Sequence, residues 1–251
     1  MLYNCNNRNI IILKIRTSRN TNAIKIASIS ENLVVFTIRI FRTSMRKRGK
    51  TMSLKIVLIN SSPKKDGNTF YLLDKLMNNI KALGADAEIL NLNEALMKLK
   101  VPFCVCCSSP CNQSCYKGTE VEEILDKVSA ADGVVFGSPV YFGSMSAQLK
   151  AFFDNCRNAR ATKAFLGKVG CAVSVGATKY GGQENTVRAI HDCMLVMGMN
   201  LIGDSSQVYG GGHFGLCAHQ PASSDEYANK RIEFLAERLV SEAEKNADSR
   251  K

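Results

Sequence analysis

The residues of this chain that are best suited to chemistry are five cysteines within twelve residues: Cys104, Cys106, Cys107, Cys111 and Cys115. Thiolates are the ligands that iron-sulfur clusters and many structural zinc ions take in proteins. The spacing Cys-x2-Cys-x3-Cys-x3-Cys, which leaves Cys106 as a spare, puts four thiols on one short segment. This segment is compact enough to surround one metal centre.

Three alternative roles of these cysteines fit the sequence less well. Structural zinc sites generally pair two Cys-x2-4-Cys knuckles across a longer gap, and this sequence lacks that arrangement. Disulfides are disfavoured because no secretory signal is recognisable and five close cysteines cannot all pair. A metal-free loop is the strongest rival. The remaining cysteines of the domain lie in apolar or small-residue contexts typical of core thiols: Cys156, Cys171, Cys193 and Cys217.

A second candidate for chemistry is the polar segment from Ser61 to Thr69, which follows an apolar run and precedes a helical pattern. Such a loop aims backbone amides and the positive end of a helix at one point, which suits a phosphate monoester. It contains neither the Gly-Lys-Ser/Thr of an ATP-binding loop nor the Gly-x-Gly-x-x-Gly of a dinucleotide site. The structural alternative is an ordinary turn with Asn68 or Thr69 as helix cap.

Two later loops favour the binding interpretation. The segment 137–154 offers a Ser-Pro turn with Tyr141 and Phe142 beside small residues, as a flat ring system requires. The segment 176–184 offers glycines that let backbone amides approach a ligand closely. The alternative for Tyr141 and Phe142 is a buried aromatic pair at the end of a strand.

The elements that must position these loops alternate between strand and helix. Apolar runs predict five buried parallel strands at 54–60, 87–92, 133–137, 169–175 and 200–203. Helical patterns cover 69–83, 121–130, 146–157, 183–197 and 224–245. This alternation predicts an α/β fold with a doubly wound, five-stranded parallel sheet that binds ligands at the carboxyl ends of its strands.

The loops 61–69, 138–154 and 181–184 resemble the three flavin loops of the NAD(P)H-dependent FMN reductase family, within the flavodoxin-like superfamily, and the resemblance covers nearly all of residues 52–245. It implies non-covalently bound FMN, with NAD(P)H as a possible donor. By this resemblance, the phosphate loop supplies Ser61, Ser62, Lys64, Asn68 and Thr69. The isoalloxazine is lined by Pro139, Val140, Tyr141, Phe142 and Gly143, and its other rim is closed by Gly176, Thr178, Gly181 and Gly182.

The cysteine segment resembles that of the iron-sulfur flavoproteins, in which a Cys-x2-Cys-x2-Cys run and a fourth cysteine hold a 4Fe-4S cluster close to FMN. The resemblance implies Cys104, Cys107, Cys111 and Cys115 as ligands. The middle gap here is one residue longer than in that pattern and the last gap is shorter, so Cys106 in place of Cys104 or Cys107 stays open.

Charge is distributed unevenly along the chain. Residues 1–51 hold eleven of the 33 Lys/Arg but only one of the 22 Asp/Glu, so residues 52–251 are nearly neutral and nucleic-acid binding loses its electrostatic support. The apolar patches of this leader are too short to span a bilayer. Its composition fits either a start codon placed upstream of Met52 or a transit segment. We expect residues 52–251 to form the FMN-binding domain, with a cysteine-rich insert at 101–118.

These features predict an FMN-dependent oxidoreductase that passes electrons between ferredoxin or NAD(P)H and a small-molecule acceptor. The alternatives are a cluster-free NAD(P)H-dependent FMN or quinone reductase and a non-enzymatic, flavodoxin-type electron carrier. The resemblance further implies a homodimer or homotetramer. Free cysteines and the missing signal peptide make the cytoplasm the default compartment, with no membrane partner.

Overall fold

The computed structural model describes residues 3–5, 8–10, 54–206 and 210–249, and the chain divides into two units, Met1–Thr51 and Met52–Lys251. In the first unit, β1 (Tyr3–Cys5) and β2 (Arg8–Ile10) form an antiparallel pair. The expected leader falls largely outside the described residues, and its assignment stays a prediction. The second unit contains the predicted domain and is described below.

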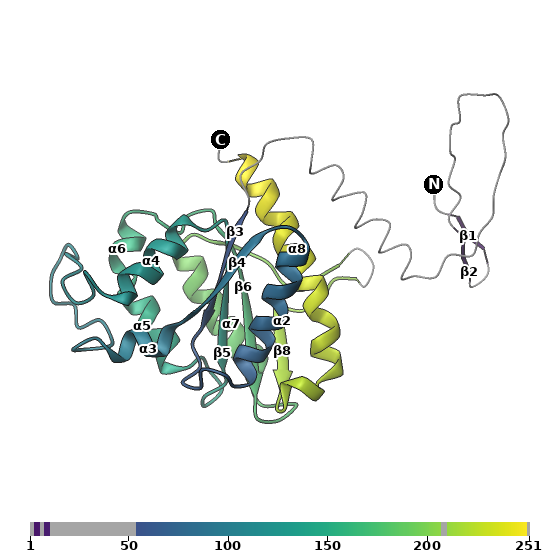
Figure 1. The fold of residues 1–251 in the computed structure, drawn as a ribbon, viewed down its shortest axis with the longest axis horizontal. Coiled ribbons are helices and arrows are strands. Elements are labelled where there is room, and N and C mark those ends of the chain that lie inside the picture. The colour runs from purple at the N-terminus through teal and green to yellow at the C-terminus, as the bar shows by residue number, and fades with distance from the viewer. Residues whose placement is uncertain (1–2, 6–7, 11–53, 207–209, 250–251) are drawn as a thin grey trace. The chain divides into compact units, whose positions relative to one another are not determined.

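The second unit is built on a parallel sheet in the order β4-β3-β5-β6-β7 (Figure 1). The strands are β3 (Lys55–Asn60), β4 (Asp86–Asn91), β5 (Gly133–Pro139), β6 (Val169–Gly176) and β7 (Asn200–Leu201). Every residue of β6 is buried, as expected of a central parallel strand that is covered on both faces. The strand order 2-1-3-4-5 confirms the predicted flavodoxin-like sheet and places the reversal of strand order between β3 and β5.

The fifth position of the sheet is shared by two short strands, which corrects the single strand predicted at 200–203. The first two residues of β6 pair with β7, and its last four residues pair in parallel with β8 (Leu216–His219). Between them the chain leaves the sheet at Gly203 and folds back on itself, with the Asp204 amide donating to the His213 carbonyl at 3.3 Å. The edge position is therefore interrupted by a glycine-rich loop.

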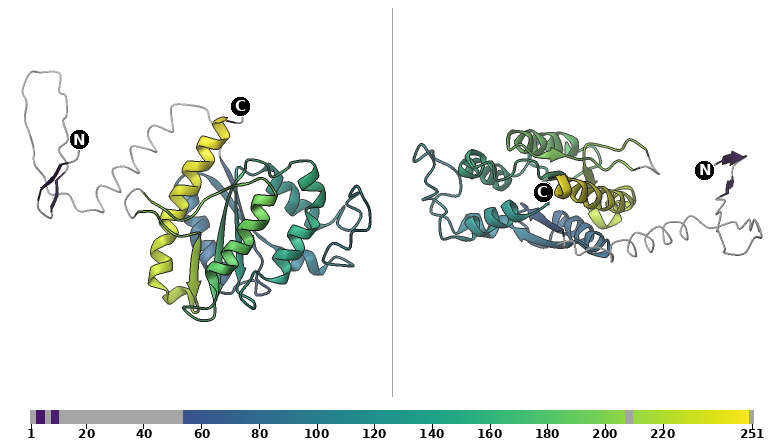
Figure 2. Two further views of the ribbon diagram at one scale, coloured as in Figure 1. Left: turned by 180° about the vertical axis from the view of Figure 1, so that it is seen from behind. Right: turned by 90° about the horizontal axis from the view of Figure 1, so that it is seen from above.

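Helices cover both faces of the sheet (Figures 1 and 2). One face packs against α2 (Asn68–Ala82) and α8 (Glu226–Ser249), and the other against α4 (Glu120–Ala130), α5 (Ala147–Asn155) and α7 (Gln183–Val196). In α2, the buried residues Leu72, Leu73, Leu76 and Ile80 recur at helical spacing and form one apolar stripe. The layers thus enclose two apolar cores, one on each face.

The shorter elements differ from the predictions. The predicted helix 146–157 ends at Asn155, and a separate short helix, α6 (Arg157–Ala161), follows it. A helix that was not predicted, α3 (Leu92–Met97), begins at the residue expected to end the second strand. A single 3-10 turn, η1 (Ala222–Ser224), precedes α8. Among the described residues, no helix is long and apolar enough to cross a membrane.

Candidate functional site

The three predicted ligand loops meet at the carboxyl ends of β3, β5 and β6. The backbone amide and the hydroxyl of Ser61 both donate to the Gly137 carbonyl, at 3.0 and 2.8 Å. The Ser146 hydroxyl donates to the Ser61 carbonyl at 3.0 Å, and the Val140 amide donates to the Val175 carbonyl at 2.9 Å. These buried bonds hold the loops after β3, β5 and β6 at one end of the sheet.

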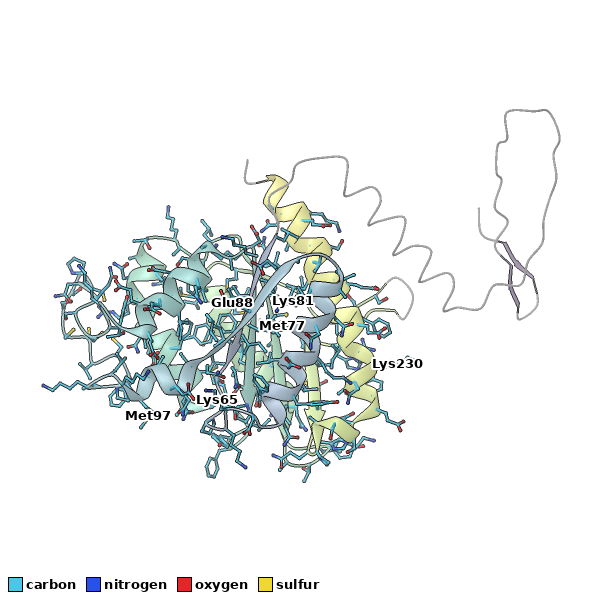
Figure 3. All side chains as sticks on the ribbon, viewed as in Figure 1. Lys65, Met77, Lys81, Glu88, Met97 and Lys230 are labelled. Atoms are coloured by element: carbon cyan, nitrogen blue, oxygen red, sulfur yellow. The ribbon has the colours of Figure 1, made fainter. Side chains whose placement is uncertain are left out.

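The loop from β3 to α2 has the features of an anion site. Helix α2 begins at Asn68, its N-cap Gly67 offers no side-chain hydrogen bond, and its first turn contains no acidic residue. Its first backbone amides are therefore available to a ligand, and the helix dipole favours a negative charge there. Lys64 and Lys65 are exposed in the same loop, where Figure 3 labels Lys65.

The polar side chains of this loop are used in different ways. Ser61 is completely buried, so its hydroxyl ties β3 to β5. The Ser62 hydroxyl accepts from the Lys64 amide at 3.1 Å, and Asn68 Oδ1 accepts from the Ala222 amide at 2.8 Å. The Ser62 bond shapes the loop itself and the Asn68 bond ties it to η1, while the assignment of these residues as phosphate ligands stays a prediction.

The loop after β5 ends in a tight hairpin that presents aromatic rings. Tyr141 and Ser144 exchange backbone hydrogen bonds of 2.9 and 3.0 Å around Phe142 and Gly143, whose φ angles are 51° and 75°. Two successive positive φ values are the signature of a type I′ turn. Tyr141 is 46% exposed and Phe142 is fully exposed, so the alternative of a buried aromatic pair is excluded.

The loop after β6 completes the rim beside this hairpin. Gly182 has a φ of 90° and caps α7, and a Cβ added there would lie 3.1 Å from the Gly143 Cα. The backbones of the two loops therefore touch at these glycines. Tyr180 projects from the same loop and is 91% exposed. An uncapped helix start and three exposed aromatic rings fit a ligand with a phosphate and a flat ring.

One residue that organises this loop was not identified from the sequence. Gln183 is buried; its Oε1 accepts from the Gly181 amide at 2.8 Å, and its Nε2 donates to the carbonyls of Thr178 at 2.6 Å and Ala218 at 3.2 Å. A Cβ on Gly176 would lie 2.6 Å from this Nε2, so the glycine leaves room for the amide. A glutamine at the start of a helix gives no sequence signal of such a role.

The cysteine loop, residues 101–118, connects α3 to α4 beside α5 and α6 (Figure 1). Its start is held by Asn155 Nδ2, which donates to the Pro102 carbonyl at 3.1 Å, and its end by the buried Tyr116. All five of its cysteines are free thiols, and Cys106 and Cys107 are exposed. The donor set of soft, unpaired thiols fits an iron-sulfur cluster.

The sulfurs of the loop share one neighbourhood without converging on a single ion. Burial raises the pKa of the Cys115 thiol, and the nearby Cys107, Cys111 and Cys104 raise this pKa further. Within the part of the chain that the structure describes, no three Cys, His, Asp or Glu side chains are arranged to hold one metal ion. A four-iron cluster requires its ligand sulfurs to lie farther apart than a single ion does.

The sheet order and the helices on both faces define a flavodoxin-like fold. The structure of the WrbA-like flavodoxin from Agrobacterium tumefaciens has the same fold, with a TM-score of 0.56 at 16% identity over 78% of this chain and 99% of that one. The model of the NADPH-dependent FMN reductase family matches residues 54–213, and the chain belongs to this family. It is therefore a flavin-dependent oxidoreductase whose family cofactor is FMN.

Two of the relatives that this chain matches are iron-sulfur flavoproteins. An iron-sulfur flavoprotein of Methanocaldococcus jannaschii is 38% identical over 162 residues, which is 63% of this chain and 81% of the relative. An iron-sulfur flavoprotein of Methanosarcina thermophila is 34% identical over 188 residues, which is 74% of this chain and 93% of the relative. The chain is thus related to the iron-sulfur flavoproteins, as its cysteine spacing predicts.

Proposed function

We propose that this reductase carries a 4Fe-4S cluster on its cysteine loop and passes electrons between ferredoxin or NAD(P)H and a small acceptor by way of FMN. The observation that carries the proposal is the set of five free thiols within twelve residues, on a loop that is anchored at both ends to a flavin-binding domain. Relatedness to two iron-sulfur flavoproteins supports the same assignment. Cys104, Cys107, Cys111 and Cys115 are the proposed ligands.

The residues at the carboxyl end of the sheet have the tasks of binding and orientation. Bound FMN supplies hydride and single-electron chemistry. The uncapped start of α2 would hold the phosphate, and Lys64 would add positive charge beside it. Tyr141 and Tyr180, whose rings are exposed, would flank the flavin ring, and Gln183 fixes the Gly181 amide of the second rim. The fully exposed Phe142 at the hairpin tip would shield the flavin ring from water and contact the acceptor.

The test compares the metal and flavin content of the full chain with that of two variants. The protein is purified without oxygen, and iron, acid-labile sulfide and FMN are quantified on the same sample. We expect about four irons per chain in the wild type. We expect the double substitution Cys107→Ser/Cys111→Ser to lose iron and sulfide while keeping FMN, because both cysteines belong to the separate loop between α3 and α4.

Cys193→Ser is the matched control, because Cys193 is also a free thiol but lies on α7 outside the cysteine loop. It should retain the iron of the wild type. Wild-type protein that contains FMN but no iron after anaerobic purification and reconstitution would refute the cluster. Equal iron in the double variant and the wild type would refute the assignment of these ligands.

A cluster-free NAD(P)H-dependent FMN or quinone reductase is the second candidate. It is favoured by the family to which the chain belongs, because the matching family model describes NADPH-dependent FMN reductases. Steady turnover with NADPH and a quinone that survives the Cys107→Ser/Cys111→Ser substitution would support it. Loss of that turnover in the double variant would contradict it.

We also propose that the chain acts as a homodimer or homotetramer. Phe142 and Tyr180 leave large apolar surfaces exposed at the rim of the flavin site, and such surfaces are commonly covered by a partner. Sedimentation velocity on the FMN-loaded protein measures the assembly directly. A monomer at micromolar concentration would contradict the proposal.

A further inference from the structure

One cation reaches the cysteine loop from the neighbouring helix. Arg157 opens α6, and its Nη1 donates to the Ser108 carbonyl at 3.1 Å, in the middle of the loop. Arg157 lines one cavity of about 490 Å³ together with Cys104, which is a proposed ligand, with Arg160, and with residues of α5 and α7 that include Asp154 and Asp192.

The position of Arg157 is fixed by its neighbours in sequence. Asn155 and Cys156 are both buried, and Asn155 binds the Pro102 carbonyl at the start of the cysteine loop. The chain segment that anchors the loop is therefore the segment that presents the guanidinium. Arg157 lies beyond the far end of α5 from Ser146, about 13 Å along this nine-residue helix.

The hydrogen-bond partner of Arg157 is the backbone of the cysteine loop rather than a carboxylate. Among the described residues, no ion pair joins Arg157 to an Asp or Glu, whereas its neighbour Lys150 is paired with Asp154 at 2.7 Å. The stretch 155–182 contains no acidic residue at all. Arg160, one turn further along, donates its Nε to the Val196 carbonyl at 3.3 Å instead.

We propose that Arg157 is a positioning residue for the cysteine loop and that its charge makes the bound cluster easier to reduce. This inference rests on the proposed function, because it requires the cluster. Four thiolates give the cluster site a negative charge, and each electron added to the cluster increases it. A fixed cation in contact with the loop favours the more negative, reduced form, because the two charges attract at short range.

The test is a potentiometric titration of the cluster followed by electron paramagnetic resonance, on full-length protein purified without oxygen. For Arg157→Gln we expect reduction to become about tenfold less favourable, which corresponds to about 59 mV for one electron. Arg157→Lys keeps the charge but loses the planar guanidinium, and we expect its cluster potential to fall by less than half as much as that of Arg157→Gln. The matched control Arg160→Gln should have the potential of the wild type.

The outcomes separate this inference from the proposed function. Wild-type protein without iron would overturn the proposed function, and the inference with it, before any variant is made. A cluster that is present, but has the same potential in Arg157→Gln and Arg160→Gln, overturns the inference alone. If Arg157→Gln fails to load iron, Arg157→His is titrated in its place at about pH 5.5 and about pH 8, where the imidazole is charged and neutral. A potential that falls more between these two pH values than in the wild type supports the inference, and the pH dependence of the wild type overturns it.

Discussion

Replacing Gln183 by methionine should loosen the second rim of the flavin site. Methionine nearly preserves the shape of the side chain but removes three hydrogen bonds, those with Gly181, Thr178 and Ala218. A hydrogen bond of this kind contributes about 0.5–1.5 kcal/mol net. The Ala218 carbonyl lies in a buried residue and loses a partner that water cannot easily replace. We therefore expect the free energy of unfolding to fall by about 2–4 kcal/mol.

The assay is urea unfolding of the protein with and without saturating FMN, together with FMN affinity from flavin fluorescence. The loss of stability should be larger in the FMN-loaded protein, because the loop that Gln183 organises is part of the predicted site. Asn185→Ala is the matched control, since Asn185 is exposed in the first turn of the same helix. Agreement of Gln183→Met and Asn185→Ala in both stability and affinity, within about 0.5 kcal/mol, would refute this role of Gln183.

Three further predictions concern packing, the ring site and pH. Gly137→Ala should lower the free energy of unfolding by about 1–3 kcal/mol, because its Cβ would lie 2.6 Å from the buried Leu73 Cδ1. An unchanged midpoint of urea unfolding would contradict this close contact between Gly137 and Leu73. Phe142→Ala should leave stability within about 0.5 kcal/mol, because the ring is fully exposed, yet raise the KM for a quinone acceptor; an unchanged KM would remove Phe142 from the site. Burial raises the pKa of the Cys171 thiol from 9.0 to about 12, so the thiol loses its proton at lower pH in the unfolded chain than in the folded one. The free energy of unfolding should therefore fall as pH rises from about 9 to 12, and it should fall less in Cys171→Ala. An equal fall in the wild type and the variant would contradict the shift.

The sheet was predictable because its strands are continuous apolar runs. Parallel strands that are buried on both faces contain almost no polar residues, and β5 and β6 fit this pattern with one serine each, Ser138 and Ser174. The fifth position was predicted only in part. Its second half, β8, has four residues and follows a glycine-rich loop whose shape depends on backbone contacts such as that between Asp204 and His213. Contacts of this kind leave no periodic pattern in a sequence.

The chemistry of the site could be predicted from the sequence better than the contacts that shape it. The cysteine spacing indicated a thiol-rich metal centre and the related family, but not that Arg157 and Asn155 hold the loop. Gln183 was missed because its partners are backbone groups, one of them at a distant position along the chain. Irregular loops are shaped by such long-range contacts, whereas hydrophobic periodicity reports only on helices and strands.

The presence of two redox centres in one chain is tested most directly by a count of the electrons that the protein accepts. Full-length protein with known FMN content is titrated anaerobically with dithionite while the visible spectrum is recorded. We predict about three electrons per chain, two for the flavin and one for the cluster, with bleaching of a broad absorption beyond the flavin bands. Saturation at about two electrons, with flavin bands alone, would contradict the presence of the cluster.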